Sequence, residues 1–338
     1  MDINSKAPRK IQLIPTALLQ ILASIMLAFS TRFGILHIGV FCIAVAGAMF
    51  AVQILAGKGY WHFAVASVSV CAAFLIGGLF PFFMCAFTLP AGIMLAVMVR
   101  KRSSKIGVSA ALEILYAVLF ALLFLAVYLL QGGEPSVNAV IAYFSGIVDS
   151  IKETAISNIE PEVMEQIAKI NEVSTEEFLE MLDISFEVFK LILPAILIST
   201  MGVLAYLTAT FFKLGTAIAG CELVLPDPKW RTLPSRASAV VFAVSYIVFS
   251  FATMFSSSFN VVMVVCISVV IILAPLMLLM GAKWFASSRN KTFILVLFVV
   301  GLLFMTPLAI MILAFFGAAE VFKLHDKIKR QQPPPENG

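Results

Sequence analysis

The sequence predicts an all-α protein, a polytopic bundle of about eight or nine transmembrane helices with a small acidic amphipathic helical insert on the outer face of the membrane. Hydrophobic residues make up 61% of the 338 residues and charged residues only 12%, about half the charged fraction of a soluble domain. Several apolar runs reach roughly 20 residues, the length at which a helix spans a bilayer. In contrast, residues 131–190 hold twelve of the nineteen acidic residues.

Nine apolar segments qualify as membrane-spanning helices by length and composition. The first segment follows Lys6, Arg9 and Lys10, but it is too long for a secretory signal and no small-x-small cleavage site follows. We therefore expect it to be retained as a helix. The nine segments lie at residues 11–30, 35–55, 60–79, 82–99, 109–130, 188–212, 239–255, 260–280 and 292–316.

The third and fourth segments are separated by only two residues, Phe80 and Pro81. Gly77 and Gly78 lie just before this proline. Proline and glycine both weaken a helix. The sequence therefore predicts a tight hairpin or a broken pair of helices at this point.

Lysine and arginine residues concentrate in alternate loops, which predicts the membrane orientation. They gather in the N-terminus, the loop after the fourth segment, the 213–238 connector and the 281–291 loop. We expect this side to be cytoplasmic, in a multi-pass protein of the inner membrane of a bacterium. With nine segments the basic tail falls on the outer side, so either one span is miscounted or the stretch 292–321 bends at Gly301 or Pro307 and returns.

Residues 131–190 carry twelve acidic and three basic residues, a net charge of −9, whereas the rest of the chain carries +13. Apolar residues recur every three or four positions from Val137, as an amphipathic helix requires. Pro161 between two glutamates is typical of a second helix start. Ser174 and Glu177 form a capping box, which opens a third helix that we expect to continue into the sixth segment.

These patterns divide the chain into seven regions. They are a basic cytoplasmic N-terminus (1–10), a five-span bundle (11–130), the extracytoplasmic insert (131–187), the sixth span (188–212), a cytoplasmic connector with prolines and a tryptophan (213–238), the C-terminal spans (239–316), and a tail that is first basic and then disordered (317–338).

Ionisable and polar residues inside the spans are the candidate functional groups. Glu113 in the fifth segment is either a coupling carboxylate or an interfacial residue paired with Arg102 or Lys105. Gln20 and Gln53 either bond between helices or contact a substrate. The irregular stretch with Gly77, Gly78 and Pro81 would border a cavity, because irregular backbone at membrane depth usually does.

A second group of residues is predicted to lie at the membrane interface. Tryptophan and basic side chains favour the layer of lipid headgroups, and basic ones favour anionic lipids. These residues are Trp230, Arg231, Arg100, Lys101 and Arg102.

Catalytic motifs are missing from the sequence. It contains no P-loop, no HExxH, no GxSxG and no paired-aspartate motif. The five cysteines have no metal-ligand spacing. We therefore expect no enzyme activity, no cofactor and no metal site. The basic patch follows one membrane face, so anionic lipid rather than nucleic acid is the expected partner.

The arrangement resembles a known family. A basic loop RKRSSK follows the fourth segment, LPDPKWRTLPSR lies in the connector, and FGAAEVFKLHDKIKR closes the chain. This resembles the YybS-like family of bacterial membrane proteins, and the first six segments look similar to substrate-binding subunits of energy-coupling-factor vitamin transporters. The resemblance implies a transporter-like fold, and fold alone does not assign function. Transport of a small-molecule substrate would also require a separate ATPase module, because the chain has no nucleotide-binding motif. The resemblance carries over no site residues.

Two functions are consistent with these residues. In the first, the chain is a transporter-like or substrate-binding membrane subunit, and Glu113, Gln20 and Gln53 line a site for a small molecule. In the second, the chain is a non-catalytic scaffold or assembly factor of the cell envelope, and the acidic insert binds a partner. Substitutions at the three polar residues would impair only the first function.

Overall fold

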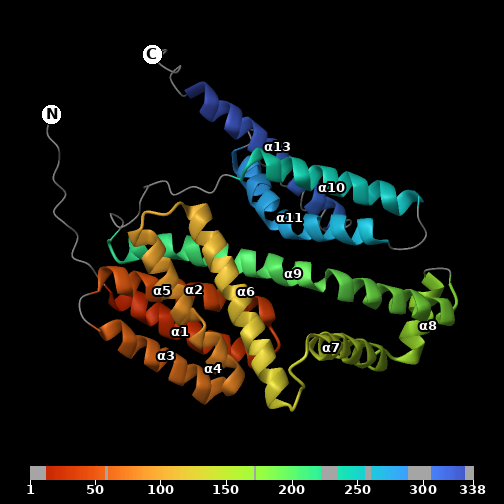
Figure 1. Cartoon of the computed structure of the whole chain (residues 1–338), viewed down its shortest axis with the longest axis horizontal. Helices are drawn as coiled ribbons and strands as arrows, with labels where there is room; N and C mark the ends of the chain where they lie inside the picture. Colours follow the sequence, from red (N-terminus) through yellow and green to blue (C-terminus); the bar gives the residue numbers. More distant parts are fainter. Residues whose placement is uncertain are drawn as a thin grey trace. The chain divides into compact units, whose positions relative to one another are not determined.

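The structure is a computed structural model that describes residues 13–57, 60–170, 173–221, 234–255, 260–287 and 306–331. All regular secondary structure in these ranges is α-helical, which confirms the predicted fold class. The helices are α1 (Ile14–Arg32), α2 (Leu36–Ala56), α3 (Trp61–Gly77), α4 (Leu79–Ala86), α5 (Thr88–Arg100), α6 (Lys105–Leu130), α7 (Val137–Ser157), α8 (Pro161–Ile170), α9 (Thr175–Ile218), α10 (Arg236–Phe255), α11 (Val261–Ser287) and α13 (Thr306–Gln331) (Figure 1).

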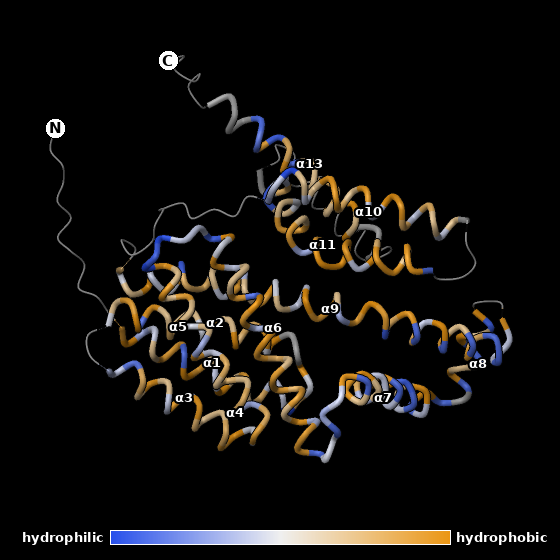
Figure 2. The backbone as a smooth tube through the Cα atoms, viewed as in Figure 1, coloured by the Kyte–Doolittle hydropathy of each residue, from blue (hydrophilic) through white to orange (hydrophobic). Residues whose placement is uncertain are grey.

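Seven apolar stretches of the described helices are long enough to cross a membrane, so the chain is a multi-pass membrane protein. The stretch of α4 and α5, which only Phe87 separates, counts as one of the seven, and α3 is a shorter apolar helix. Most of the ninth expected segment, 292–316, lies outside the described residues. In Figure 2, α11 is hydrophobic along most of its length, whereas α7 and α8 alternate between hydrophobic and hydrophilic residues.

The chain divides into two compact units. The first consists of Met1–Ala121 with Thr200–Leu233, and the second of Leu122–Ser199 with Pro234–Gly338. Helices α6 and α9 are each divided between the two units. The first unit therefore contains α1 to α5, the first part of α6 and the last part of α9.

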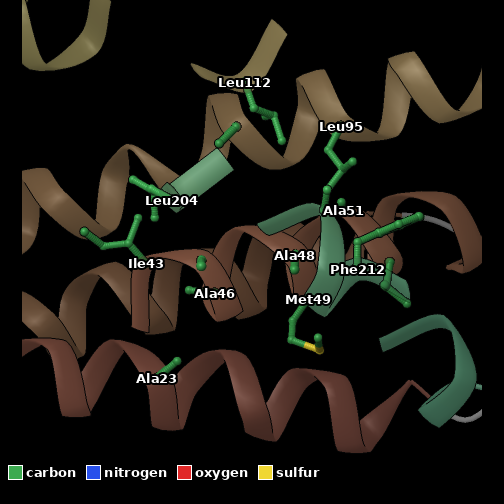
Figure 3. Packing of buried hydrophobic residues seen from close by; sticks show 14 of the residues in the cluster. Ala23, Ile43, Ala46, Ala48, Met49, Ala51, Leu95, Leu112, Leu204 and Phe212 are labelled. Atoms are coloured by element: carbon green, nitrogen blue, oxygen red, sulfur yellow. The ribbon is translucent and has the colours of Figure 1, made fainter. Parts of the chain in front are cut away.

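Small residues of α2 form the centre of the first unit. Ala44, Ala48 and Ala51 are completely buried, and larger side chains such as Leu95, Leu112 and Phe212 close around α2 from α5, α6 and α9 (Figure 3). Lipid chains are as apolar as leucine, so helices in a membrane gain stability mainly from close packing, which small residues permit.

Close packing of this kind occurs where α5 crosses α2. A Cβ atom at Gly92 would lie 2.7 Å from Cδ1 of Phe50 and 2.9 Å from the carbonyl oxygen of Gly47. Gly92 therefore lets the two backbones approach, and no larger residue fits without a shift of the helices.

The predicted break between the third and fourth segments is confirmed, although it lies at Gly78. Helix α3 ends at Gly77, and Gly78 has a φ of +80°, which favours glycine. Pro81 lies in the first turn of α4, where its missing N–H costs no helical hydrogen bond.

In the second unit, the acidic insert consists of α7, α8 and the start of α9, as the sequence predicts. The Ser136 hydroxyl accepts a hydrogen bond from the Ala139 N–H and caps α7. Ser174 and Glu177 form the reciprocal capping box before α9. Helix α9 has 44 residues, a length of about 66 Å. This is about twice the thickness of the hydrocarbon core, so one helix forms both insert and span.

The C-terminal helices α10, α11 and α13 pack on one another in the second unit. Arg236 at the start of α10 forms an ion pair with Asp326 of α13, and Nε2 of His325 lies 2.9 Å from the carbonyl oxygen of Pro234. Further along α10 and earlier in α13, Phe315 packs against Phe242 and Tyr246. Helix α13 is therefore antiparallel to α10.

This direction bears on the location of the tail. The C-terminal end of α13, with Lys323 and the basic residues after it, lies at the same end as the start of α10. The connector that leads into α10 is predicted to be cytoplasmic. The contacts thus support a tail on that side and oppose the outer location that follows from counting nine segments.

Candidate functional site

Gln20 and Gln53 contact each other across the interface of α1 and α2. They are 1% and 0% exposed, and the Gln53 Nε2 donates a hydrogen bond of 2.9 Å to the Gln20 Oε1. The remaining amide atoms, Nε2 of Gln20 and Oε1 of Gln53, are buried and have no partner among the described residues. A neutral bond of this kind holds two membrane helices together without burying charge.

The Gly77–Pro81 stretch is packed against α1. A Cβ atom at Gly77 would lie 2.5 Å from Cγ of Pro81 and 3.2 Å from Cβ of Ala28. Pro81 is buried, whereas Leu79 and Phe80 beside it are exposed on the surface of the unit. These contacts account for the two glycines and the proline through packing and backbone geometry.

Polar side chains form a row between α6 and α9 in the first unit. Lys105 is 7% exposed, its Nζ donates to Oγ1 of Thr210 at 3.0 Å, and it lies 4.3 Å from the centre of the Tyr206 ring. The hydroxyl of Thr210 in turn donates to the carbonyl oxygen of Tyr206. A buried ammonium group is stabilised by such an oxygen ligand and by the face of an aromatic ring.

Glu113 belongs to the same row, two turns further along α6. Its carboxylate packs over Gly202 of α9, because a Cβ atom at Gly202 would lie 3.4 Å from Oε1 of Glu113. No ion pair or hydrogen bond of Glu113 occurs among the described residues, so the expected pairing with Arg102 or Lys105 is not found. Glu113 is only partly buried.

Ser109 lies between these two ionisable residues on α6. Its Oγ is buried and has no partner among the described residues. Lys105, Ser109 and Glu113 are spaced four residues apart and therefore share one face of the helix. Gly202, Tyr206 and Thr210 have the same spacing on α9. We call these six residues the α6–α9 polar row.

A buried hydrogen bond closes the interface beside this row. The Tyr116 and Thr208 hydroxyls are 3.1 Å apart and buried. Thr208 already donates to the carbonyl oxygen of Leu204, so Tyr116 is the donor. The pair is neutral and fully satisfied, unlike Glu113.

The predicted interface residues of the loop after α5 lie at one end of the first unit. Arg100 is the last residue of α5, and its guanidinium donates to the carbonyl oxygen of Ile54 at the end of α2. Lys101 and Arg102 follow in the turn and are exposed, and Arg102 has a φ of 55°. Trp230 and Arg231 lie outside the described residues.

Ion pairs fix α7 of the insert to the first half of α9. Lys190 bonds to Asp149 at 2.7 Å and to Glu187 at 2.6 Å, and Lys152 bonds to Asp183 at 3.0 Å. The hydrogen bond from Lys190 lowers the pKa of the Asp149 carboxyl below its usual value. At the other end of α7, the ring of Tyr143 packs against Phe124 and Tyr128 of α6.

No candidate metal-binding cluster occurs in the part of the chain that the structure describes. No group of three or more histidine, cysteine, aspartate or glutamate residues gathers there in a way that could hold a metal ion. The five cysteines are free thiols.

Comparisons with known proteins give no match. No protein-family model, no curated protein and no solved structure is similar to this chain. The site must therefore be interpreted from its own chemistry.

The polar row was only partly predicted from the sequence. Glu113 was singled out, whereas Ser109, Tyr206 and Thr210 were not, and Lys105 was considered only as a partner for Glu113. The spacing of four residues on α6 was a visible signal. The sequence holds no such signal for the partners on α9, because Thr210 is 105 residues away from Lys105 in the chain.

Proposed function

We propose that the chain is a transporter-like membrane protein for a small solute, in which Glu113 is the ion-coupling residue. The observation that carries the proposal is the Glu113 carboxylate, which lies over Gly202 without an ion pair or hydrogen bond among the described residues. It is about 12 Å from the start of α6 along the helix axis. An unpaired carboxylate at membrane depth is costly, and such residues usually bind or transfer ions.

Two alternatives were open for Gln20 and Gln53, and this proposal takes contact between helices rather than contact with a substrate. Their hydrogen bond to each other explains their burial. The proposal therefore rests on the α6–α9 polar row, and it assigns no catalytic activity to the chain. The YybS-like and energy-coupling-factor resemblance is consistent with solute transport, and it adds a separate ATPase module as a further partner to be tested.

The orientation in the membrane is a second part of the proposal. Arg100, Lys101, Arg102 and Lys105 gather at one end of the first unit, and a basic end of this kind faces the cytoplasm of a bacterial inner membrane. The acidic insert would then be on the outer face. A cysteine at Val137 should react with a membrane-impermeant maleimide on intact cells, and a cysteine at Lys101 should not. The reverse pattern would invert the topology.

Labelling with dicyclohexylcarbodiimide, an apolar reagent for protonated carboxyl groups, tests the role of Glu113. We expect mass spectrometry to find the label on Glu113 in purified protein, with more labelling as the pH falls and protection by sodium if a cation binds. Glu153, which is exposed on α7, serves as an internal control that stays unlabelled at neutral pH. Unlabelled Glu113 at every pH from 5 to 8 would exclude a coupling role.

A scaffold function is the second candidate, and one observation favours it. The insert carries an open apolar groove on α7. A substitution test separates the two functions, because Glu113→Gln should abolish ion-dependent activity and leave partner binding to the insert unchanged.

A further inference from the structure

One face of α7 lines an open groove. It has a volume of about 730 Å³, and its lining includes Tyr143, Gly146, Ile147, Ser150, Ile151 and Thr154. These residues share one face of the helix by their spacing. Ile151 is 53% exposed, and a Cβ atom at Gly146 would meet nothing within 4 Å. The groove is apolar with a few hydroxyl groups and contains no charged side chain.

Helix α7 is held in place by its neighbours in the second unit. Val148 is 1% exposed, Asp149 and Lys152 pair with residues of α9, and the Tyr143 hydroxyl donates to Gln131 at 2.6 Å. The groove face is therefore presented on a helix that is fixed at several points. Such a preformed surface binds a partner at a low cost in conformational entropy.

The segment that carries the groove is strongly negative. Lys152 and Lys190 are two of the three basic side chains in residues 131–190, and both are engaged with acidic residues. Glu153 is exposed on α7 about 60° around the helix from Ser150. Glu160 is exposed in the turn that follows α7. The net charge of −9 of residues 131–190 already includes these lysines, so the segment attracts cationic groups.

We propose that this groove binds a basic amphipathic helix of a partner protein. Its apolar side chains would lie in the groove, and its lysine or arginine residues would lie near acidic side chains such as Glu153 and Glu160. Charge complementarity selects this occupant. A second copy of residues 131–190 would bring another net charge of −9 to the same place, and like charges disfavour that contact. Anionic lipid headgroups are repelled for the same reason.

The test uses the full-length protein in nanodiscs of zwitterionic phosphatidylcholine. The probe is a fluorescent peptide of leucine and lysine in which the leucines recur every three or four residues, and the comparison peptide has the same composition in a scrambled order. We expect fluorescence anisotropy to show binding of the amphipathic peptide at least about tenfold tighter than that of the scrambled one.

Two variants locate the site. Gly146→Trp fills the groove without a change of charge and should weaken binding about tenfold or more. Val137→Ser is the matched control, because Val137 is an exposed apolar residue of α7 (75% exposed) outside the groove lining. It should leave affinity unchanged. The double variant Glu153→Gln, Glu160→Gln should weaken binding less and reduce its dependence on salt.

Several outcomes would overturn the proposal. Equal affinity for the scrambled peptide, or for the Gly146→Trp variant, would show that the peptide senses only the negative charge. Equal binding to nanodiscs without protein would assign the binding to lipid. A dimer in native mass spectrometry that Gly146→Trp converts to a monomer would show that a second copy occupies the groove. None of these outcomes depends on Glu113.

Discussion

The membrane bundle of the first unit and the acidic insert of the second are both entirely helical where they are described, but different forces hold them together. The bundle relies on close backbone approach at small residues and on neutral buried hydrogen bonds. The insert relies on exposed ion pairs, helix caps and aromatic contacts. The comparison shows that the surroundings of a helix, lipid or water, decide which interactions hold it in place. In lipid an unpaired charge is costly, whereas in water an exposed ion pair forms readily and contributes little.

The largest expected effect concerns glycine in the two regions. Gly92→Ala should destabilise the bundle by about 1–3 kcal/mol, because the new Cβ atom meets Phe50 and the backbone of Gly47. The same substitution at Gly146 meets nothing and should stabilise α7 by about 0.5–1 kcal/mol through helix propensity. Unfolding by SDS in mixed micelles, followed by circular dichroism, measures the first effect.

The two substitutions control each other, since both replace a helical glycine by alanine. Hydrogen exchange of the α7 amides reports the local effect of Gly146→Ala. If Gly92→Ala also increased stability, the close contact between α2 and α5 would be wrong.

A smaller effect is expected for the glutamine pair. Gln53→Leu should cost about 1 kcal/mol, because it removes the bond to Gln20 and leaves a buried amide without a partner. A double-mutant cycle with Gln20→Leu should give an interaction energy of about 0.6–1.7 kcal/mol. A cycle of Gln20→Leu with Gln131→Leu, which lies in the other unit, should be additive. Additivity in the first cycle would exclude the bond.

The smallest effect distinguishes the insert by its response to pH. The hydrogen bond from Lys190 lowers the pKa of Asp149, so this contact stabilises the folded insert above the ordinary carboxyl pKa of 3.8 and is lost as the pH falls through the lowered value. Lys152 adds a weaker attraction, while Glu187 shares Lys190 and Asp183 shares Lys152. We expect lower protection of the α7 amides at low pH, measured as the exchange rate relative to that of an unstructured peptide at the same pH.

The variant Asp149→Asn isolates this contribution, because protonation of the other acids relieves repulsion and acts in the opposite direction. In the variant, protection in α7 should be lower already at neutral pH and should change less on acidification. Protection in α2 should not respond to either change. An identical pH response of variant and natural protein would assign no stabilising role to the Asp149–Lys190 contact.

The local features of this protein were predictable because they depend on neighbouring residues. The long apolar segments predicted the membrane helices, Gly77 and Gly78 predicted the break, and Ser174 with Glu177 predicted the start of α9. The extension of the third insert helix into the sixth span also followed, since no helix-breaking signal separates them. Pro194 lies inside α9 without ending it.

The sequence by itself determined the helical class, the acidic insert, the caps and the set of polar residues inside the spans, because hydrophobicity and helix signals act over a few residues. Only the tertiary structure decided the partners. It joined Gln20 to Gln53, placed Lys105 against Tyr206 and Thr210 and not against Glu113, left Glu113 over Gly202, and directed the basic end of α13 toward Arg236. The physical reason is that these contacts join helices far apart in the chain, and the small residues that set how closely the helices pack also select which side chains meet.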